Sequence, residues 1–532
     1  MGGAVAAVVN QDEAHYTSIP NNTNKSWWRD SCLRWNMLHC LGLCGTLFFN
    51  GYDGSLMNSL QSITAWQEYF HHPNSNILGL MNSSGFLPGL IVCWIADIFA
   101  HHYGKRLTVW IGSVFAIIGA LIIGLAQNTG MFIAGRAVMG IGVQGTLVVA
   151  PALLQEIAHP RYRSRLSGMY MSIYYFAAIV SSSVSRGTLH LSGDKAWRVP
   201  ALLQIVGPIL TILMTATAPE SPRWLEKRGE SAKARQVLAK YHANGDENDE
   251  LVTFEYRQIQ EALQSEEVNA QIKYTDYLKG AGNRHRLLII VVVSLGTNWV
   301  GNGIVSYYLS PILNTLGITD SNQQLDINVG LQVWNFLCST GAALAIDKAG
   351  RRPLWLTSTA GMLVTFSIVM ALSAVYAQHG QHSVGTAVIP FLFLYLGFYD
   401  IAWTPLSYSY PVEILTFSMR TKGQAIFVFL QTLGMAVNTW VNPIAFNAIT
   451  WRYYGVYLAL ISIILAIIYF KFPETRNLTI EEIAVIFDGD RAFNGHVSDV
   501  MGTRAEGLGA GAGHDGDLKT AENIEQTSTT SV

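Results

Sequence analysis

The sequence predicts an all-α membrane protein in which twelve transmembrane helices form two six-helix bundles joined by a cytosolic helical linker. Three observations support this fold class. Only 13% of the 532 residues are charged, about half the usual share. Apolar runs of about 20 residues, long enough to cross a bilayer as a helix, recur twelve times. A polar stretch separates the first six runs from the last six.

The twelve apolar runs are the predicted membrane spans. The first six lie near residues 37–58, 77–99, 107–126, 131–155, 166–187 and 200–218. The last six lie near residues 287–308, 327–347, 354–376, 386–410, 422–446 and 453–471. One such run could be a buried core helix of a soluble protein, but a dozen of them indicate a membrane.

The spans divide the chain into five predicted regions. An N-terminal tail (1–35) precedes the first bundle (36–218), a linker (219–286) leads to the second bundle (287–472), and a C-terminal tail (473–532) follows. The linker contains "ESAKARQVLAKYH", which has the pattern of an amphipathic helix in water. The C-terminal tail begins with a predicted short helix, "LTIEEIAVIFDG", and continues into a segment that cannot bury enough apolar surface to fold.

The short loops predict the orientation of the chain in the membrane. The loops after the second, fourth, eighth and tenth spans are rich in Lys and Arg, whereas those after the first, third, seventh and ninth contain neither. Because Lys and Arg of short loops stay on the cytosolic side, both termini and the linker are expected in the cytosol.

Composition also excludes several classes of function. The net charge of −2 comes without a basic patch, so nucleic acid is not an expected partner. No P-loop is present, which excludes an ATP-driven pump, and "GIGVQG" lies inside a span, where it indicates helix packing. No catalytic constellation appears, and we expect no enzyme activity, cofactor or metal. The cysteines are expected to be buried free thiols: Cys32, Cys40, Cys44, Cys93 and Cys338.

Three short motifs occur once in each half of the chain, in the same order. "HHYGKR" and "DKAGRR" follow the second and eighth spans, and "EIAHPRYRS" and "EILTFSMRT" follow the fourth and tenth. "PESPRW" and "PETRNL" follow the sixth and twelfth. Two six-helix halves related by a parallel repeat, with a site between them, are typical of a transporter.

These motifs, with "GRAVMGIGVQG", "WRVPALLQ" and "FPETRNLTIEE", resemble the signature set of the sugar porters of the major facilitator superfamily. The resemblance covers about residues 36–488. "KYHANGD" and "LVTFEYRQIQEA" are further similar to the fungal sugar and lactose permease branch. The resemblance implies the major facilitator fold, alternating access and a sugar as substrate.

Two charges inside the first bundle are candidates for proton coupling. Asp53, in "FFNGYDGSLM", and Arg136 both lie roughly 10 Å below the outer surface, so they can pair. One interpretation is a static ion pair between the first and fourth spans. The other is a protonation switch, in which Asp53 takes a proton when the pair breaks, because burial disfavours its charge. The resemblance favours the switch, since proton symporters of the family carry these two residues.

A second carboxylate, Asp400, lies near the middle of the tenth span. Two interpretations remain open. It could line the cavity and bond a substrate hydroxyl, or it could satisfy backbone groups freed by Pro405.

Polar and aromatic residues of the seventh, tenth and eleventh spans form the predicted sugar site. A neutral sugar needs many donors and acceptors and an aromatic face in a cavity between the halves. The candidates are Asn298, Asn302, Tyr307, Tyr308, Asp400, Trp403, Tyr408 and Gln431. Gln431 matches a sugar-binding position of the family, but Thr297 and Met171 stand where the family has glutamine. Each polar residue could instead join helices inside a bundle.

Acidic and basic residues at the inner ends of the spans match the family's inner charge network. Salt bridges between the bundles at this end would stabilise the outward-facing state and break when the protein opens inward. The predicted gate residues are Glu156, Arg163, Glu220, Arg223, Asp347, Arg351, Glu413 and Arg420.

We therefore expect a multi-pass transporter of a fungal plasma membrane that imports a sugar with a proton. The sugar would be a hexose or a small oligosaccharide such as lactose or cellobiose, and the protein would work as a monomer in the lipid bilayer. The alternatives are a sugar sensor that does not transport and a carrier of a non-sugar metabolite.

Overall fold

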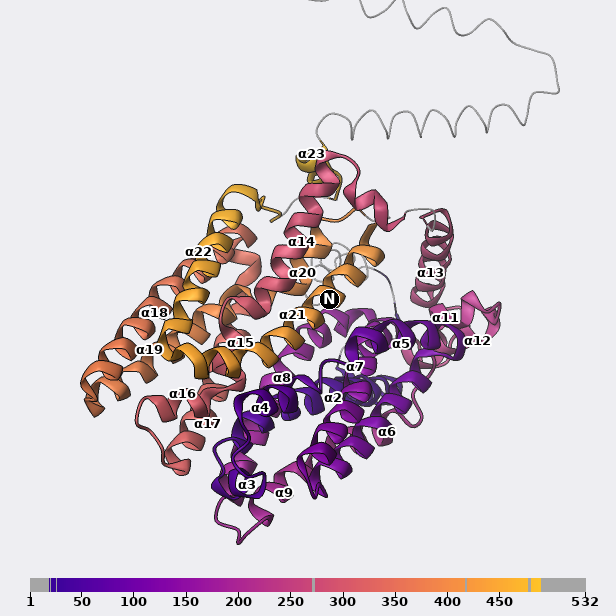
Figure 1. The fold of residues 1–532 in the computed structure, drawn as a ribbon. Coiled ribbons are helices and arrows are strands. Elements are labelled where there is room, and N and C mark those ends of the chain that lie inside the picture. The colour runs from indigo at the N-terminus through magenta and orange to yellow at the C-terminus, as the bar shows by residue number, and fades with distance from the viewer. Residues whose placement is uncertain are drawn as a thin grey trace, which may run out of the picture.

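The structure, a computed structural model, describes residues 19, 21–24, 26–269, 273–416, 419–476 and 480–488. The described part is helical, and its elements fall into two halves and a linker (Figure 1). The first half, coloured indigo to magenta, and the second half, coloured pink to yellow, lie side by side. The short helices of the linker lie together at one end of the molecule. We call this the linker end and the opposite end the far end.

The first half begins with a short 3-10 helix and continues with nine α-helices. They are η1 (Trp27–Arg29), α2 (Ser31–Leu60), α3 (Thr64–Tyr69), α4 (Ser75–Ser83), α5 (Gly89–Tyr103), α6 (Lys105–Gly124), α7 (Thr129–Ile157), α8 (Pro160–Thr188), α9 (Lys195–Leu203) and α10 (Val206–Thr215). The linker contains α11 (Pro222–Lys227), α12 (Ser231–His242), α13 (Glu250–Asn269) and η2 (Tyr274–Leu278).

The second half repeats the pattern and ends in a short tail helix. Its elements are α14 (Ala281–Trp299), α15 (Asn302–Tyr307), α16 (Leu309–Thr315), α17 (Ser321–Ala349), α18 (Arg351–His379), α19 (His382–Ala402), α20 (Leu406–Glu413), α21 (Arg420–Ile449), η4 (Thr450–Arg452), α22 (Tyr453–Lys471) and α23 (Ile480–Asp488). The helical linker and the short helix predicted after Pro473 are confirmed.

Each predicted span corresponds to a helix or to a pair of helices, so the predicted fold class is confirmed. Seven helical stretches of the described residues are long and apolar enough to cross a membrane by length and composition. One of them, from Lys422 to Lys471, contains two predicted spans. The second predicted span is not among them because it is divided into α4 and α5, which are 9 and 15 residues long.

Four predicted spans are divided into two helices each. Proline explains three of the breaks, because it cannot donate the hydrogen bond to the carbonyl four residues earlier. Pro88 and Pro405 lie in the breaks between α4 and α5 and between α19 and α20. Pro208 lies in the first turn of α10 and cannot donate to the carbonyl of Gln204 in the break between α9 and α10. The fourth break, between α14 and α15, contains Gly301 with a φ of 100°.

Side-chain caps begin several of the long helices. Asn74 Oδ1 accepts from the Ile77 amide at the start of α4, and Asn128 Oδ1 accepts from the Met131 amide at the start of α7. Asp320 does the same for α17. A short polar side chain at this position satisfies an amide that the helix leaves without a partner.

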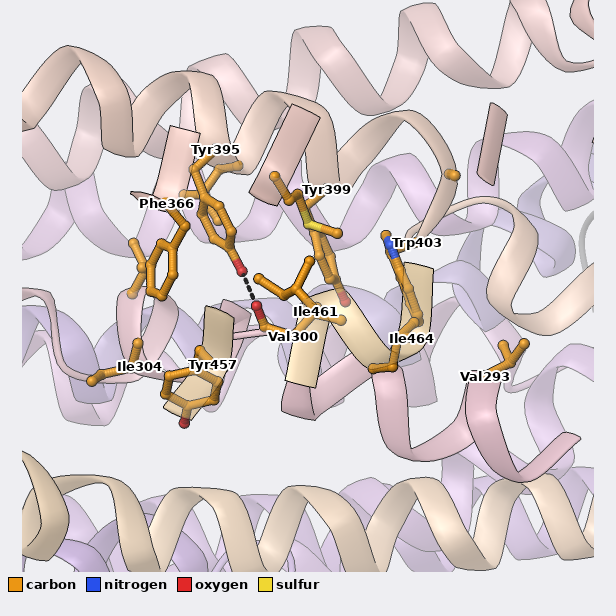
Figure 2. Packing of buried hydrophobic residues seen from close by; sticks show 14 of the residues in the cluster. Val293, Val300, Ile304, Phe366, Tyr395, Tyr399, Trp403, Tyr457, Ile461 and Ile464 are labelled. Carbon is orange, nitrogen blue, oxygen red and sulfur yellow. Dashed lines mark hydrogen bonds between the residues drawn. The ribbon is translucent and has the colours of Figure 1, made fainter. Parts of the chain in front are cut away.

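The two halves have separate hydrophobic cores. Figure 2 shows part of the second core, in which Tyr399 of α19 and Trp403, directly after this helix, lie close to Ile461 and Ile464 of α22. The Tyr395 hydroxyl donates to the Val300 carbonyl, 2.7 Å away, at the break after α14. The halves meet where α17 packs on α8 and α21 packs on α4. We call this contact the seam.

Large apolar side chains also cover the outer faces of the helices. Ile95, Leu213, Leu337 and Phe470 are more than half exposed, as are several others on the outer surface. A water-soluble protein rarely exposes so much apolar surface, whereas a lipid-facing helix requires it. The outer surface therefore agrees with a multi-pass membrane protein.

Candidate functional site

Asp53 and Arg136 form a buried ion pair inside the first half. The Arg136 Nη1 group of α7 donates to Asp53 Oδ1 of α2, and the two residues are 3% and 8% exposed. Arg136 also donates to the carbonyls of Met81, at 3.3 Å, and Asn82, at 3.4 Å, where α4 ends. The guanidinium therefore ties α2, α4 and α7 together and compensates the charge of Asp53.

Two adjacent tyrosines of α8 connect this pair with the seam. The Tyr174 hydroxyl packs against Gly54, which follows Asp53 in α2. A Cβ on Gly54 would lie only 2.8 Å from the oxygen of this hydroxyl. Tyr175 points across the seam instead, and its hydroxyl donates to Asp400 Oδ1 at 2.6 Å. The two rings lie 5.4 Å apart. One turn of α8 therefore contacts the surroundings of both intramembrane carboxylates.

Asp400 lies one turn before the break between α19 and α20. Its Oδ1 atom also accepts from the Thr404 hydroxyl at 2.6 Å, so both bonds to the carboxylate come from hydroxyl groups. The side chain is 1% exposed, and its Oδ2 atom has no hydrogen-bond partner among the described atoms. Neither of these two bonds involves a backbone group freed by Pro405.

Three of the predicted sugar-binding residues form one connected cluster. The Tyr408 hydroxyl donates to Gln431 Oε1 at 2.7 Å, and Asn298 Nδ2 donates to the Gln431 carbonyl at 3.1 Å. Asn438, which sequence reasoning did not select for the site, donates to the Asn298 carbonyl at 2.8 Å. The break after α14 and the break before α20 bring these groups from three helices together.

The other predicted sugar-binding residues lie outside this cluster. Asn302 accepts from the Ser306 hydroxyl at 2.8 Å, one turn further along α15. The Tyr308 hydroxyl donates to the Thr439 carbonyl, and Tyr307 is buried beside Phe86. Each of these side chains is therefore engaged in helix packing in this conformation.

Trp403 lies in the core of the second half, where Figure 2 shows it beside Ile464. Its indole donates to Thr359 Oγ1 at 3.3 Å, and its ring centroid lies 4.8 Å from that of Trp355. The structure does not bring this ring to the cluster of Asn298, Tyr408 and Gln431. Sequence position alone could not tell which face of the helix turns inward.

The repeated motifs build the same arrangement at the linker end of each half. Glu220 of "PESPRW" accepts from the backbone amides of Lys105 and Arg106, the first residues of α6. Glu474 of "PETRNL" accepts from the amides of Arg351 and Arg352, the first residues of α18. A carboxylate is favourable there because a helix N-terminus carries partial positive charge. The internal repeat is therefore structural.

A glycine at the turn before each of these helices makes this contact possible. Gly104 and Gly350 have φ angles of 105° and 86°, which side chains rarely adopt. A Cβ on Gly104 would also lie 2.5 Å from Glu220 Oε2. The glycine of "GKR" and "GRR" is thus required both by its backbone angle and by the approach of the glutamate.

The glutamates of "EIAHP" and "EILTF" occupy equivalent positions. Glu156 binds the Lys105 ammonium group at 2.6 Å and accepts from the Ser221 hydroxyl at 2.5 Å. Glu413 binds Arg351 at 3.3 Å and accepts from the Thr475 hydroxyl at 2.6 Å. Lys105 was not among the predicted gate residues, although it occupies the same position in "GKR" as Arg351 occupies in "GRR".

Arg163 pairs with the linker. Its Nη2 atom lies 3.1 Å from Glu255 Oε1 of α13. Glu255 and its second partner, His242, were also missed, although both lie in the two motifs that indicated the fungal branch. Arg420 donates to the Leu415 carbonyl at 3.3 Å, and Arg223 lies in the first turn of α11. The side chain of Asp347 in α17 lies outside the described residues, as does that of Met171 in α8.

These linker-end ion pairs run within one half or from a half to the linker. Besides the bond from Tyr175 to Asp400, several hydrogen bonds between described residues cross from one half to the other at the far end. Asn58 Nδ2 donates to Asn328 Oδ1 at 3.2 Å, and Asn328 Nδ2 donates to the Ser59 hydroxyl at 3.0 Å. An ion pair of 2.6 Å between Arg186 and Asp326 crosses beside them. The halves are thus joined at the far end by residues that sequence reasoning did not select.

Comparisons with known proteins agree with this architecture. The sequence model of a family described as "Sugar (and other) transporter" matches residues 39–487. The high-affinity glucose transporter of Kluyveromyces lactis is 28% identical over 464 residues, which cover 83% of this chain and 82% of that protein. These relatives are transporters and not enzymes.

Solved structures share the fold. The inward open conformation of the xylose transporter XylE from E. coli matches with a TM-score of 0.70 at 21% identity, over 86% of this chain and 100% of that chain. The proton:xylose symporter XylE bound to 6-bromo-6-deoxy-D-glucose matches with a TM-score of 0.69 at 21% identity, over 85% of this chain and 99% of that chain. Because the family model spans most of the sequence, the resemblance to sugar porters is confirmed, and the chain belongs to the sugar (and other) transporter family.

Proposed function

We propose that this protein imports a sugar together with a proton by alternating access. The observation that carries the proposal is the buried pair of Asp53 and Arg136 close to the seam. A purely structural contact there could be apolar, since burying two charges is costly even when they pair. A carboxylate whose counter-charge can be withdrawn is instead suited to binding and releasing a proton. Support also comes from the similar proteins, which include a glucose transporter and a proton:xylose symporter.

The proposed sugar site is centred on Asn298, Tyr408 and Gln431 at the seam side of the second half. Their amide and hydroxyl groups can donate and accept, which matches the hydroxyl groups of a sugar. In the described conformation they bond to one another. Binding would therefore exchange protein–protein hydrogen bonds for protein–sugar bonds. We propose a hexose or a small oligosaccharide, such as lactose or cellobiose, as substrate.

The proposed setting is the plasma membrane, with both termini and the linker in the cytosol. The linker end would then be the inner gate, built from Glu156, Arg163, Glu413 and Arg351 together with the other predicted gate residues. The far end, closed by Asn58 and Asn328, would be the outer gate. In the transport cycle the far-end bonds would break while contacts between the halves form at the linker end. The protein is proposed to act as a monomer.

Uptake in a yeast strain without its own sugar transporters tests this proposal. Glucose, xylose, lactose and cellobiose would be compared at about pH 5 and about pH 7.5, with Asp53→Asn beside the wild type. We expect faster uptake at the lower pH, and we expect Asp53→Asn to abolish this difference while sugar exchange across the membrane persists. Equal uptake at both pH values would contradict proton coupling.

A carrier of a non-sugar metabolite is a second candidate. It is favoured by Thr297 and Met171, which replace glutamines of the family's sugar site. If the protein reaches the cell surface of the same strain but none of the four sugars is taken up, the result would support this candidate or a sensor. Uptake of a labelled metabolite that sugars do not inhibit would then identify the carrier.

A further inference from the structure

Asp400 is a buried carboxyl group that bridges the two halves. The bond from the Tyr175 hydroxyl crosses the seam from α8 to α19, whereas the bond from Thr404 comes from the same half. Both bonds end on Oδ1, and Oδ2 is buried without a described hydrogen-bond partner. One oxygen of this carboxyl group therefore accepts two hydrogen bonds, whereas the other accepts none from the described residues.

The titratable groups around Asp400 do not compensate a negative charge. Tyr175 faces it from α8, Cys338 faces it from α17, and Tyr399 precedes it in its own helix. All three are ordinarily uncharged near neutral pH. Asp53 differs, because Arg136 neutralises it. Among the described residues, no Lys, Arg or His forms an ion pair with Asp400.

A carboxylate in this position is unfavourable, because charge is costly inside the membrane and none of the described basic residues pairs with it. Adding a proton to Oδ2 removes the charge and keeps both hydroxyl bonds to Oδ1. When the halves separate and water reaches the carboxyl group, its ionised form becomes favourable again. Closure of the seam and protonation of this side chain are thus thermodynamically linked.

We propose that Asp400 is a second proton-binding group and that its protonated form is the one that closes on Tyr175. The step is a simple equilibrium in which the carboxylate takes one proton from water before closure and returns it after opening. The proposal deepens the proposed function, since it adds a second titratable site to a proton-coupled transporter. Because α8 contacts the surroundings of both Asp53 and Asp400, a movement of α8 would affect the two sites together.

Infrared spectroscopy of the purified full-length protein in lipid vesicles tests the protonation directly, without any transported sugar. The wild type, Asp400→Asn and Asp53→Asn would be compared near pH 7. We expect a protonated-carboxyl band in the wild type and in Asp53→Asn, and its loss in Asp400→Asn. Tyr175→Phe should shift this band, because it removes one hydrogen bond to the group. If the wild type and Asp400→Asn show the same protonated-carboxyl signal, the proposal is overturned.

A second measurement needs no Asp400 variant and therefore does not depend on its folding. A hydrophobic carbodiimide reacts with protonated carboxyl groups, and mass spectrometry of peptides locates the adduct. We expect modification at Asp400 that decreases as pH rises, and more modification there than at Asp53. Absence of modification at every pH, in protein whose Asp400 peptide is detected, would contradict the proposal.

Transport then separates proton binding from sugar binding. For a sugar that the wild type accumulates, Asp400→Asn should lower accumulation and flatten the pH profile while exchange continues. A raised KM with an unchanged pH profile would show instead that Asp400 binds the sugar. If the wild type transports none of the sugars, the proposed function fails, but the infrared and labelling results still decide whether Asp400 holds a proton.

Discussion

Glu255 and Arg163 join the linker to the first half through an ion pair of 3.1 Å. The second oxygen of Glu255 lies 2.6 Å from His242 Nδ1, and His242 Nε2 faces the Ile157 carbonyl at 3.1 Å. Both ring nitrogens of His242 therefore face oxygen atoms, one of Glu255 and one of the Ile157 carbonyl. Burial alone would raise the pKa of Glu255, but the charges and hydrogen bonds of His242 and Arg163 outweigh it and lower this pKa.

Glu255→Gln should detach the linker and lower the thermal stability of the protein. Removing one partner of a buried pair costs about 3 to 5 kcal/mol, because the other charges stay buried. Since the folded pKa of Glu255 is lowered, its contribution is present above the unfolded value of about 4.3 and is lost as pH falls further. Thermal unfolding of wild type and variant in detergent would be compared at neutral and acidic pH. Glu261→Gln is the matched control, because Glu261 pairs with Arg257 at the surface, and an equal loss in both variants would contradict this prediction.

Arg136→Lys should abolish most transport, although it keeps the positive charge. A lysine has a single ammonium group and cannot contact Asp53 and the carbonyls of Met81 and Asn82 in the geometry of the guanidinium. Uptake and surface expression would be measured together. Arg257→Lys on the exposed face of the linker serves as the control, and wild-type uptake by Arg136→Lys would show that charge alone suffices.

Cross-linking the far end should stop transport reversibly. Arg186 and Asp326 contact each other across the seam, so cysteines at both positions can be joined by a short bifunctional methanethiosulfonate reagent, whose disulfide bonds a reductant cleaves. We expect uptake to fall after treatment of Arg186→Cys with Asp326→Cys and to return after reduction. The two single variants control for the five native cysteines. Continued uptake by cross-linked protein would exclude opening at the far end.

Gly140→Val should destabilise the first half, because α7 crosses the break between α4 and α5 with almost no space. A Cβ at Gly140 would lie 2.2 Å from the Gly85 carbonyl oxygen. Overpacking of this kind costs about 1 to 3 kcal/mol, and contact with backbone leaves little room to relax. Gly145→Val is the control in the same helix, because a Cβ there would meet Val92 at 3.5 Å, an ordinary contact. Folded yield and thermal unfolding of the two variants would be compared, and equal values would contradict the prediction.

The sequence alone was sufficient for the architecture. Apolar runs of membrane-spanning length recur because lipid leaves no other stable form for the backbone than a helix with all its hydrogen bonds internal. The three repeated motifs were also readable, because each performs the same local task twice. Asp53 and Arg136 could also be selected from the sequence. A charge inside an apolar run is costly in the membrane, so it indicates a structural or functional role.

Which polar side chains meet was decided only by the tertiary structure. The bond from Tyr175 to Asp400 depends on how α8 and α19 approach each other across the seam. Trp403 and Tyr408 are five residues apart in the same broken span, yet one enters the core and the other meets Gln431. The linker partner of Arg163 was hidden because Glu255 lies 92 residues further along the chain. Local patterns determine which segments become helices, because that choice depends on near neighbours and the surrounding lipid, whereas the pairing of their faces depends on packing between segments far apart in the chain.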